Sequence, residues 1–165
     1  MNKTLIAFGT RFGATAKSSE VIARELKEKF NHEVEVVKLS SETETVDIAK
    51  FDNVIVGSSI AKFSWTKRAK KFLKNDFNGK KLFVFISSGG ITYPKLAKGE
   101  MDKYEKWKGR FLDKVVEKNA NIEPTSTAVF GGWIKKGNTG EYTLHNWKEE
   151  DMVKWAEEIG KLTEK

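Results

Sequence analysis

The 165-residue sequence contains no cysteine and only two prolines. Without cysteine it can form no disulfide, no thiolate metal site and no thiol nucleophile, as is typical of a cytoplasmic protein. Its two histidines, His32 and His145, lie far apart without metal-ligand spacing, so we expect no metal site. The sequence also lacks an apolar run of about 18 residues and an apolar signal segment at its start. We therefore expect no membrane span and a cytoplasmic location.

Acidic residues are in the minority, since 30 Lys and Arg face 23 Asp and Glu and give a net charge of +7. A positive surface attracts nucleic acids, anionic membranes or acidic proteins. Most lysines alternate with acids, as in "RELKEKF", which is typical of a solvated helix face, so we expect no nucleic-acid partner. The exception runs from Lys67 to Lys81, where Asp76 is the only acid. We expect this basic stretch to dock an acidic partner or an anionic surface.

Apolar residues make up 39% of the chain, which excludes a disordered protein and suits one folded domain spanning residues 1–165. Continuous apolar runs predict buried strands at residues 3–8, 53–58, 82–87 and 127–130, and an alternating run predicts a less buried strand at 33–39. Helices are predicted at residues 15–30, 65–75 (with Ser64 as N-cap), 100–118 and 148–162, and a loop at 40–47. Five strands that alternate with helices predict a single α/β domain with a doubly wound parallel sheet.

Sheets of this kind bind ligands beyond the carboxyl ends of their strands, where the strand order reverses. Three segments are expected there, at residues 10–15, 58–65 and 87–98. All three are rich in Ser, Thr, Gly and aromatic residues. They are therefore the predicted site.

The first of these segments, "GTRFGAT", fits none of the common nucleotide motifs. The dinucleotide pattern G-x-G-x-x-G, the ATP loop G-x-x-x-x-G-K-[ST], the acidic pair of a receiver domain and the nucleophile elbow G-x-S-x-G are all absent. What remains is T-x-x-G-x-T, from Thr10 to Thr15, leading into a predicted helix. Hydroxyl and backbone N–H groups that converge at a helix N-terminus suit a single dianionic phosphate.

At this point the sequence resembles the flavodoxin family, which holds flavin mononucleotide (FMN) with a T-x-T-G-x-T loop. The segments "GTRFGAT", "VIVGSSI" and "FISSGG" carry the resemblance, which covers nearly the whole chain. It implies a flavodoxin-like sheet with strand order 2-1-3-4-5. The layout is most similar to the subgroup that includes menaquinone-dependent protoporphyrinogen oxidase.

The resemblance implies a set of FMN contacts in the three loops. The phosphate would be wrapped by Thr10, Arg11, Phe12, Gly13, Ala14 and Thr15. The ring edge would follow Ser59, Ile60, Ala61, Lys62 and Phe63, and the pyrimidine side would meet Ser88, Gly89, Gly90 and Ile91. Trp65 and Tyr93 lie in the right loops to stack on the flavin, although Trp65 suits the core of its helix equally well. We expect Trp107, Trp147 and Trp155 in the core, and we favour the core over a cleft wall for Trp133.

Two departures from the family pattern stand out. Phe12 occupies a position that usually carries a hydroxyl, and the charged Arg11 could supply the missing phosphate contact. The turn after the third strand, at Ala61, Lys62 and Phe63, contains no glycine, and other residues resist a positive φ.

No residue has the setting of a general acid, base or nucleophile, which suits chemistry performed by a flavin. We therefore predict an FMN-binding redox protein that transfers electrons to a partner protein. An FMN-dependent oxidoreductase acting on a quinone-type molecule or on protoporphyrinogen is the alternative. The stretch "KKGNTGEYTLHN" after the fifth strand is briefer and more polar than the insertion of that oxidase, which argues against full transfer of its activity. A flavin-free interaction domain is the second alternative.

Overall fold

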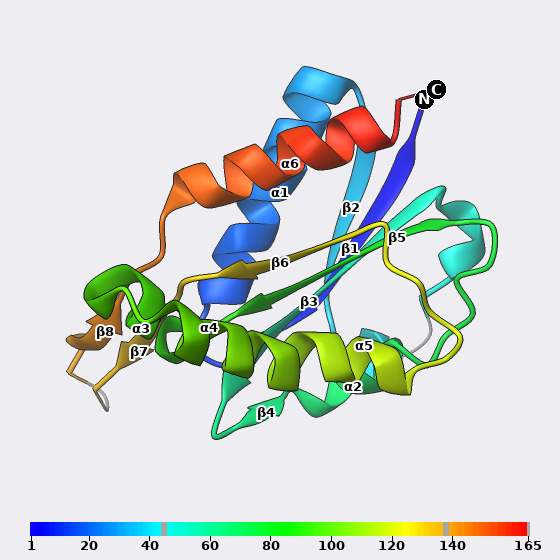
Figure 1. Cartoon of the computed structure of the whole chain (residues 1–165). Helices are drawn as coiled ribbons and strands as arrows, with labels where there is room; N and C mark the ends of the chain where they lie inside the picture. The colour runs from blue at the N-terminus through cyan, green and yellow to red at the C-terminus, as the bar shows by residue number, and fades with distance from the viewer. Residues whose placement is uncertain (44–45, 137–138, 165) are drawn as a thin grey trace.

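The computed structural model describes residues 1–43, 46–136 and 139–164, and these residues form a central sheet with helices on both faces (Figure 1). The parallel strands are β1 (Lys3–Gly9), β2 (Glu33–Lys38), β3 (Asn53–Ala61), β5 (Lys81–Ser87) and β6 (Ser126–Phe130). Over the described residues their order is β2-β1-β3-β5-β6, and β4 (Ser64–Trp65) pairs antiparallel with β3. Counted over the parallel strands alone this is the order 2-1-3-4-5, so the predicted fold class is confirmed.

The strands lie where the apolar runs placed them. β1, β3 and β5 are buried along nearly their whole length because helices cover both faces of the sheet. The edge strand β2 is mostly exposed, as its alternating sequence predicts. Parallel register aligns Ala7 with Val56 and Val56 with Val84, so the three inner strands end at the same edge of the sheet. We call this the carboxyl edge and the opposite one the amino edge.

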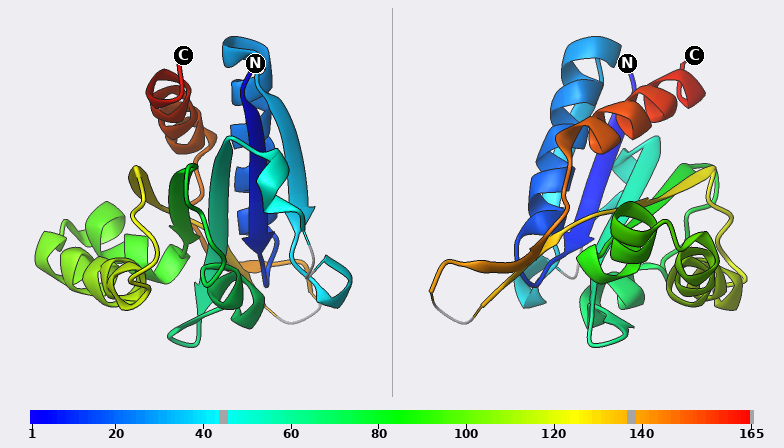
Figure 2. Two further views of the ribbon diagram at one scale, coloured as in Figure 1. Left: turned by 90° about the vertical axis from the view of Figure 1, so that its right-hand side faces the viewer. Right: turned by 60° about the vertical axis from the view of Figure 1, so that its left-hand side comes forward.

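Two helices cover one face of the sheet. They are α1 (Ala14–Phe30) and α6 (Glu149–Leu162), which lie side by side in Figures 1 and 2. Gly160 of α6 faces the ring of Phe30 so closely that a Cβ atom would lie 2.4 Å from it. α6 faces the sheet with Met152, Trp155 and Ile159, which are all buried.

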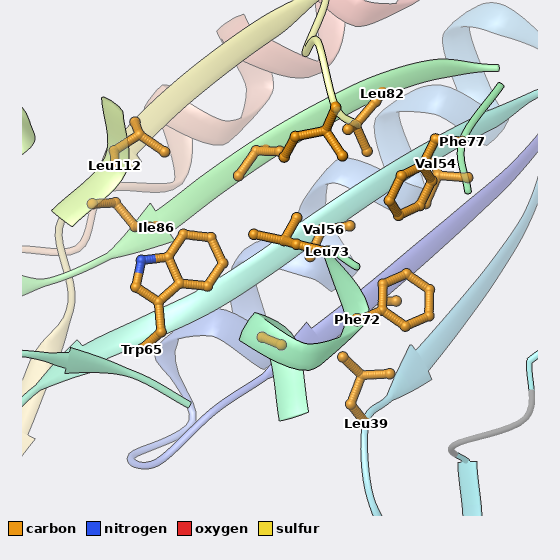
Figure 3. Close-up of a cluster of buried hydrophobic side chains, with 14 of the residues drawn as sticks. Leu39, Val54, Val56, Trp65, Phe72, Leu73, Phe77, Leu82, Ile86 and Leu112 are labelled. Carbon is orange, nitrogen blue, oxygen red and sulfur yellow. The ribbon is translucent and has the colours of Figure 1, made fainter. Parts of the chain in front are cut away.

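The other face of the sheet is covered by shorter helical segments. These are α2 (Lys67–Phe72), α3 (Gly89–Lys98), α4 (Met101–Lys108), the π-helical segment η3 (Gly109–Asp113) and α5 (Lys114–Lys118). Figure 3 shows the core beneath α2, where Phe72 and Leu73 meet Val54 and Val56 of β3. Trp65 and Leu112 belong to the same cluster. Within the described ranges no helix is both long and apolar enough to cross a membrane.

The predicted helix at 65–75 begins too early. Ser64 and Trp65 form β4 instead of a helix start, and α2 begins at Lys67 with Thr66 as its N-cap. The reason is tertiary: β3 runs on to Ala61, and the indole of Trp65 packs into the core and donates a hydrogen bond to the Phe111 carbonyl at 2.6 Å. Ser64 is thus wrong as an N-cap.

The segment after β5 was expected to be a loop and is the helix α3. Its N-cap Ser88 accepts a hydrogen bond from the Ile91 N–H at 3.1 Å, and Gly99 ends it in the left-handed conformation. Pro94 lies inside α3. The long helix predicted at 100–118 is present, but η3 interrupts it with a π turn.

The strands β7 (Trp133–Lys135) and β8 (Tyr142–His145) form an antiparallel hairpin that the sequence did not predict. Residues 137–138, which lie between these strands in the sequence, are outside the described residues, as are 44–45 of the predicted loop 40–47 and the last residue of the predicted domain 1–165. The described part of that loop region holds two short 3₁₀ turns, η1 (Ser41–Thr43) and η2 (Ile48–Lys50).

A polar network closes the amino edge of the sheet. The buried His32 ring bonds Thr4 Oγ1 through Nδ1 at 2.8 Å and Thr163 Oγ1 through Nε2 at 3.1 Å. The amide of Asn53 donates to Thr4 Oγ1, and the amide of Asn2 donates to the Thr163 carbonyl. This network joins β1 and β3 to the end of α6.

Candidate functional site

A cavity of about 630 Å³ opens at the carboxyl edge, where β1, β3 and β5 end. This volume lies within the range of roughly 300–1,000 Å³ that is usual for ligand pockets. Its walls come from the three loops predicted from the sequence and from two elements that were not predicted to contribute. The lining residues are Thr10, Arg11, Phe12, Ala14, Ser59, Ile60, Ala61, Lys62, Phe63, Ser87, Ser88, Gly89, Gly90, Ile91, Trp107, Phe111, Gly132, Trp133 and Ile134.

The loop between β1 and α1 has the geometry of an anion site. Gly13 is the N-cap of α1 with φ +94°, a conformation that glycine adopts without strain. Its N–H donates to Thr10 Oγ1 at 3.0 Å, which folds the loop back toward the helix. The free amide groups and dipole of the 17-residue α1 then favour a negative charge in front of it.

Three buried hydroxyl groups around this edge have no hydrogen-bond partner within the described part of the chain. They are Thr15 Oγ1 at the start of α1, Ser59 Oγ in β3 and Ser87 Oγ at the end of β5. A buried hydroxyl without a hydrogen-bond partner lowers the stability of the folded protein by roughly 1–3 kcal/mol. Three of them at one edge are explained by a polar ligand that bonds them. The donor set therefore fits a hydroxyl-rich phosphate ester.

Arg11 contacts the β3–β4 hairpin. Its guanidinium donates to the carbonyls of Ser59, Ser64 and Trp65 at 3.2, 3.0 and 2.9 Å. Partial burial lowers the pKa of Arg11, although a guanidinium stays charged at neutral pH. These bonds would have to break before Arg11 could replace a phosphate hydroxyl contact as the sequence suggested.

The turn of this hairpin differs from expectation. Lys62 has φ +50° and Phe63 has φ +60°, so both non-glycine residues adopt the left-handed conformation that was expected to be resisted. A two-residue hairpin turn of type I′ requires positive φ at both central positions. The bonds from Arg11 to the flanking carbonyls hold the turn despite this strain.

The aromatic walls of the cavity are not the ones expected. Trp65 is a core residue and Tyr93 is on α3, and neither lines the cavity. Trp107, Phe111 and Trp133 line it instead, although Trp107 and Trp133 were favoured as core residues. Phe111, which belongs to η3, stacks on Phe63 of the β3–β4 turn with ring centroids 6.3 Å apart.

Hydrogen bonds join the β7–β8 hairpin region both to the loop between β1 and α1 and to α3. Trp133 Nε1 donates to the Phe12 carbonyl at 2.6 Å, and its ring stacks on His145 at 5.4 Å. Asn146 accepts from the Gly132 N–H and donates to the Gly89 carbonyl, both at 3.0 Å. The sequence offered one signal for this role, namely the pair Gly131 and Gly132 directly before Trp133.

Most of the predicted site residues therefore come together. Thr10, Arg11, Phe12, Ala14, the five residues from Ser59 to Phe63 and the four from Ser88 to Ile91 all line the cavity. Gly13 and Thr15 do not line it: Gly13 is the N-cap of α1 and Thr15 lies in the first turn of that helix. Sequence reasoning missed Trp107, Phe111, Gly132 and Ile134, favoured the core for Trp133, and placed Ser87 in the third expected segment without assigning it a contact. Among the described residues no group of three or more His, Asp or Glu side chains could hold a metal ion.

Comparison with solved structures places this architecture among known folds. Flavodoxin 1 from Bacillus cereus superimposes with a TM-score of 0.63 at 17% identity, covering 98% of this chain and 99% of that one. A flavodoxin from Fusobacterium nucleatum, solved with bound flavin mononucleotide, gives 0.55 at 17% identity, covering 99% and 100%. A flavo di-iron protein from Thermotoga maritima gives 0.62 at 17% identity, where this chain covers 36% of the larger protein.

Comparison of the sequence with curated proteins gave no match. The family described as flavodoxin domain, in contrast, matches residues 5–156. That match includes β1 from Leu5 onward, the other four parallel strands, the loop before α1 and the β7–β8 hairpin. The chain is a member of the flavodoxin domain family.

Proposed function

We propose that the protein binds FMN in the carboxyl-edge cavity and transfers electrons through it to a redox partner. The three unpartnered buried hydroxyls of Thr15, Ser59 and Ser87 carry this proposal. Family membership supports it, and the Fusobacterium flavodoxin of the same fold was solved with this nucleotide. A cytoplasmic location is part of the proposal.

In this proposal each of the three predicted loops binds one part of the nucleotide. The loop from Thr10 to Thr15 and the amino end of α1 hold the phosphate, which the helix dipole stabilises. The hairpin from Ser59 to Phe63 follows the edge of the ring, and the start of α3 from Ser88 to Ile91 meets its pyrimidine side. Bound FMN supplies reversible electron transfer, while the chain binds it, orients it and excludes water.

An FMN-dependent oxidoreductase is the second candidate, and the aromatic wall of the cavity favours it. Trp107, Phe111 and Ile134 give the cavity an apolar side beyond the polar loops. Such a side suits a planar apolar acceptor such as a quinone or a tetrapyrrole like protoporphyrinogen. A flavin-free interaction domain is the weakest candidate, because it leaves three buried hydroxyls without a partner.

Ligand titration followed by flavin fluorescence tests the first candidate. FMN is expected to bind more tightly than FAD, and riboflavin, which lacks the phosphate, about a hundredfold more weakly than FMN. Equal affinity for riboflavin and FMN would show that the protein does not bind the phosphate group. An NADH- or NADPH-driven rate that saturates with a soluble quinone would favour the oxidoreductase over the carrier.

A further inference from the structure

The surface beside the cavity has a charge unlike the rest of the molecule. From Asn53 to Asn75 the sequence contains no Asp or Glu, while Lys62, Lys67, Lys70 and Lys74 are all exposed. Lys67, Lys70 and Lys74 follow the spacing i, i+3, i+7, so they share the outward side of α2 and the turn after it. None of these four lysines forms an ion pair within the described part of the chain.

On the opposite face of the sheet, two positive side chains form ion pairs. There Glu25 of α1 pairs with Arg24 and Lys29, and these reach Glu149 and Glu157 of α6. Arg24 and Lys29 on that face are thus neutralised by neighbours. The four lysines of the preceding paragraph have no such partners among the described residues, so their positive charge acts on an approaching molecule over about 8 Å at physiological salt.

An exposed aromatic ring lies at the tip of the same hairpin. Phe63 is 72% exposed, although large apolar side chains are usually buried. The guanidinium of Arg110 lies 5.9 Å from its ring centre, and Lys62 is its neighbour in the turn. An aromatic ring surrounded by charged groups is the usual anatomy of a protein–protein contact.

Only part of the basic stretch predicted from the sequence belongs to this surface. Lys80 Nζ donates to the Phe51 carbonyl at 2.6 Å, and Lys81 Nζ donates to the Leu162 carbonyl. Lys81 begins β5, whereas the cavity lies at the other end of that strand, at Ser87. Six steps of about 3.3 Å separate them by roughly 20 Å.

We propose that Lys62, Phe63, Lys67, Lys70, Lys74 and Arg110 form a docking surface for an acidic redox protein. We call these six residues the basic docking surface. The redox character of the partner rests on the proposed function, because Lys62 and Phe63 also line the cavity and a protein seated on them covers its mouth. The acidic character rests on the charges alone. A single exposed ring favours a protein over a nucleic acid, which usually needs several aromatic side chains on which its bases stack.

A nuclear magnetic resonance titration of the isotope-labelled protein tests this surface, with an acidic [2Fe–2S] ferredoxin as the probe. We expect shifts confined to residues 60–75 and 107–111, without FMN as well as with it. The Kd should rise at least about tenfold when ionic strength increases from about 0.02 to about 0.3 M. No shift at low salt, or binding indifferent to salt, would overturn the proposal.

Charge reversal separates the surface from the overall charge. The triple variant Lys67→Glu, Lys70→Glu, Lys74→Glu should weaken ferredoxin binding at least about tenfold. The matched variant Lys27→Glu, Lys154→Glu, Lys161→Glu changes the net charge equally on exposed positions of α1 and α6 and should change the Kd less than about twofold. Equal weakening by both would show that the total charge, and not this surface, attracts the probe.

Phe63→Ser identifies the class of partner. It should weaken ferredoxin binding about fivefold and leave the salt dependence unchanged. Phosphatidylserine vesicles and a single-stranded oligonucleotide are the competing probes, and tighter binding of either, insensitive to Phe63→Ser, would overturn the protein partner. FMN titration of the wild-type protein is a separate measurement, so absence of flavin binding together with intact ferredoxin docking would contradict the proposed function alone.

Discussion

The two edges of the sheet handle buried polar groups in opposite ways. At the amino edge Thr4, His32, Asn53 and Thr163 are bonded to one another or to nearby backbone. At the carboxyl edge the hydroxyls of Thr15, Ser59 and Ser87 have no partner in the described chain, and the turn at Lys62 and Phe63 is strained. Satisfied groups stabilise a fold, while unsatisfied and strained ones are typical of sites that wait for a ligand. The amino edge of the sheet therefore stabilises the fold, while the carboxyl edge holds the candidate site.

The largest effect is expected where the carboxyl edge loses its anion site. Gly13→Val combined with Thr15→Ala should weaken FMN binding about a hundredfold or more, because valine resists φ +94° and the second change removes an unpartnered hydroxyl. Isothermal calorimetry measures this affinity. Gly79→Val is the matched control, since Gly79 has φ +75° but lies away from the cavity. Wild-type affinity in the double variant would misplace the phosphate site.

At the amino edge the expected effect is on stability alone. His32→Ala should lower the free energy of unfolding by about 2–3 kcal/mol, because it opens a cavity and removes bonds to two buried threonines. Urea denaturation measures it, and FMN affinity should stay unchanged. His145→Ala, at an exposed position, should change stability by less than about 0.5 kcal/mol. A large drop in FMN affinity in His32→Ala would break the separation between the edges.

Neighbouring serines allow the sharpest comparison. Ser59→Ala and Ser87→Ala should each weaken FMN binding about fivefold while leaving the ligand-free protein as stable or up to about 1 kcal/mol more stable. Ser58→Ala is the control: Ser58 Oγ donates to the Ser59 carbonyl and accepts from the Thr66 N–H, so its loss should destabilise by about 1 kcal/mol. Thermal melting with and without FMN measures both quantities. Destabilisation by all three variants alike would mean that the two hydroxyls are bonded after all.

The smallest effect concerns the strained turn. Lys62→Gly should stabilise the ligand-free protein by a few tenths to about 1 kcal/mol, because glycine adopts φ +50° without strain. Lys70→Gly, at a helical position of α2, should instead destabilise by about 1 kcal/mol. Urea denaturation compares the two variants. A loss of stability in Lys62→Gly would show that the turn holds no strain.

The sequence predicted the sheet and three of the cavity walls because both depend on local patterns. Apolar runs such as "LFVFIS" read as buried strands wherever helices cover them, and the segment from Thr10 to Thr15 marks an anion loop by its own spacing. Errors arose where distant contacts compete with local preference. Trp65 fits the first turn of a helix, but its indole hydrogen bond to Phe111 keeps it in β4. The segment after β5 was expected to be a loop, but the Ser88 cap starts α3 there.

By itself, then, the sequence determined the parallel α/β sheet, the order of its loops and the positive charge beside one of them. Tertiary structure alone decided which aromatic side chains face the cavity, since an apolar residue in a helical pattern suits a core or a cavity wall equally well. Trp107, Phe111 and Trp133 became walls because η3 brings Phe111 against Phe63 and the β7–β8 hairpin bonds to the Phe12 carbonyl. Trp65, in contrast, packs into the core from β4, and Tyr93 is exposed on α3, although both lie closer in sequence to the loops.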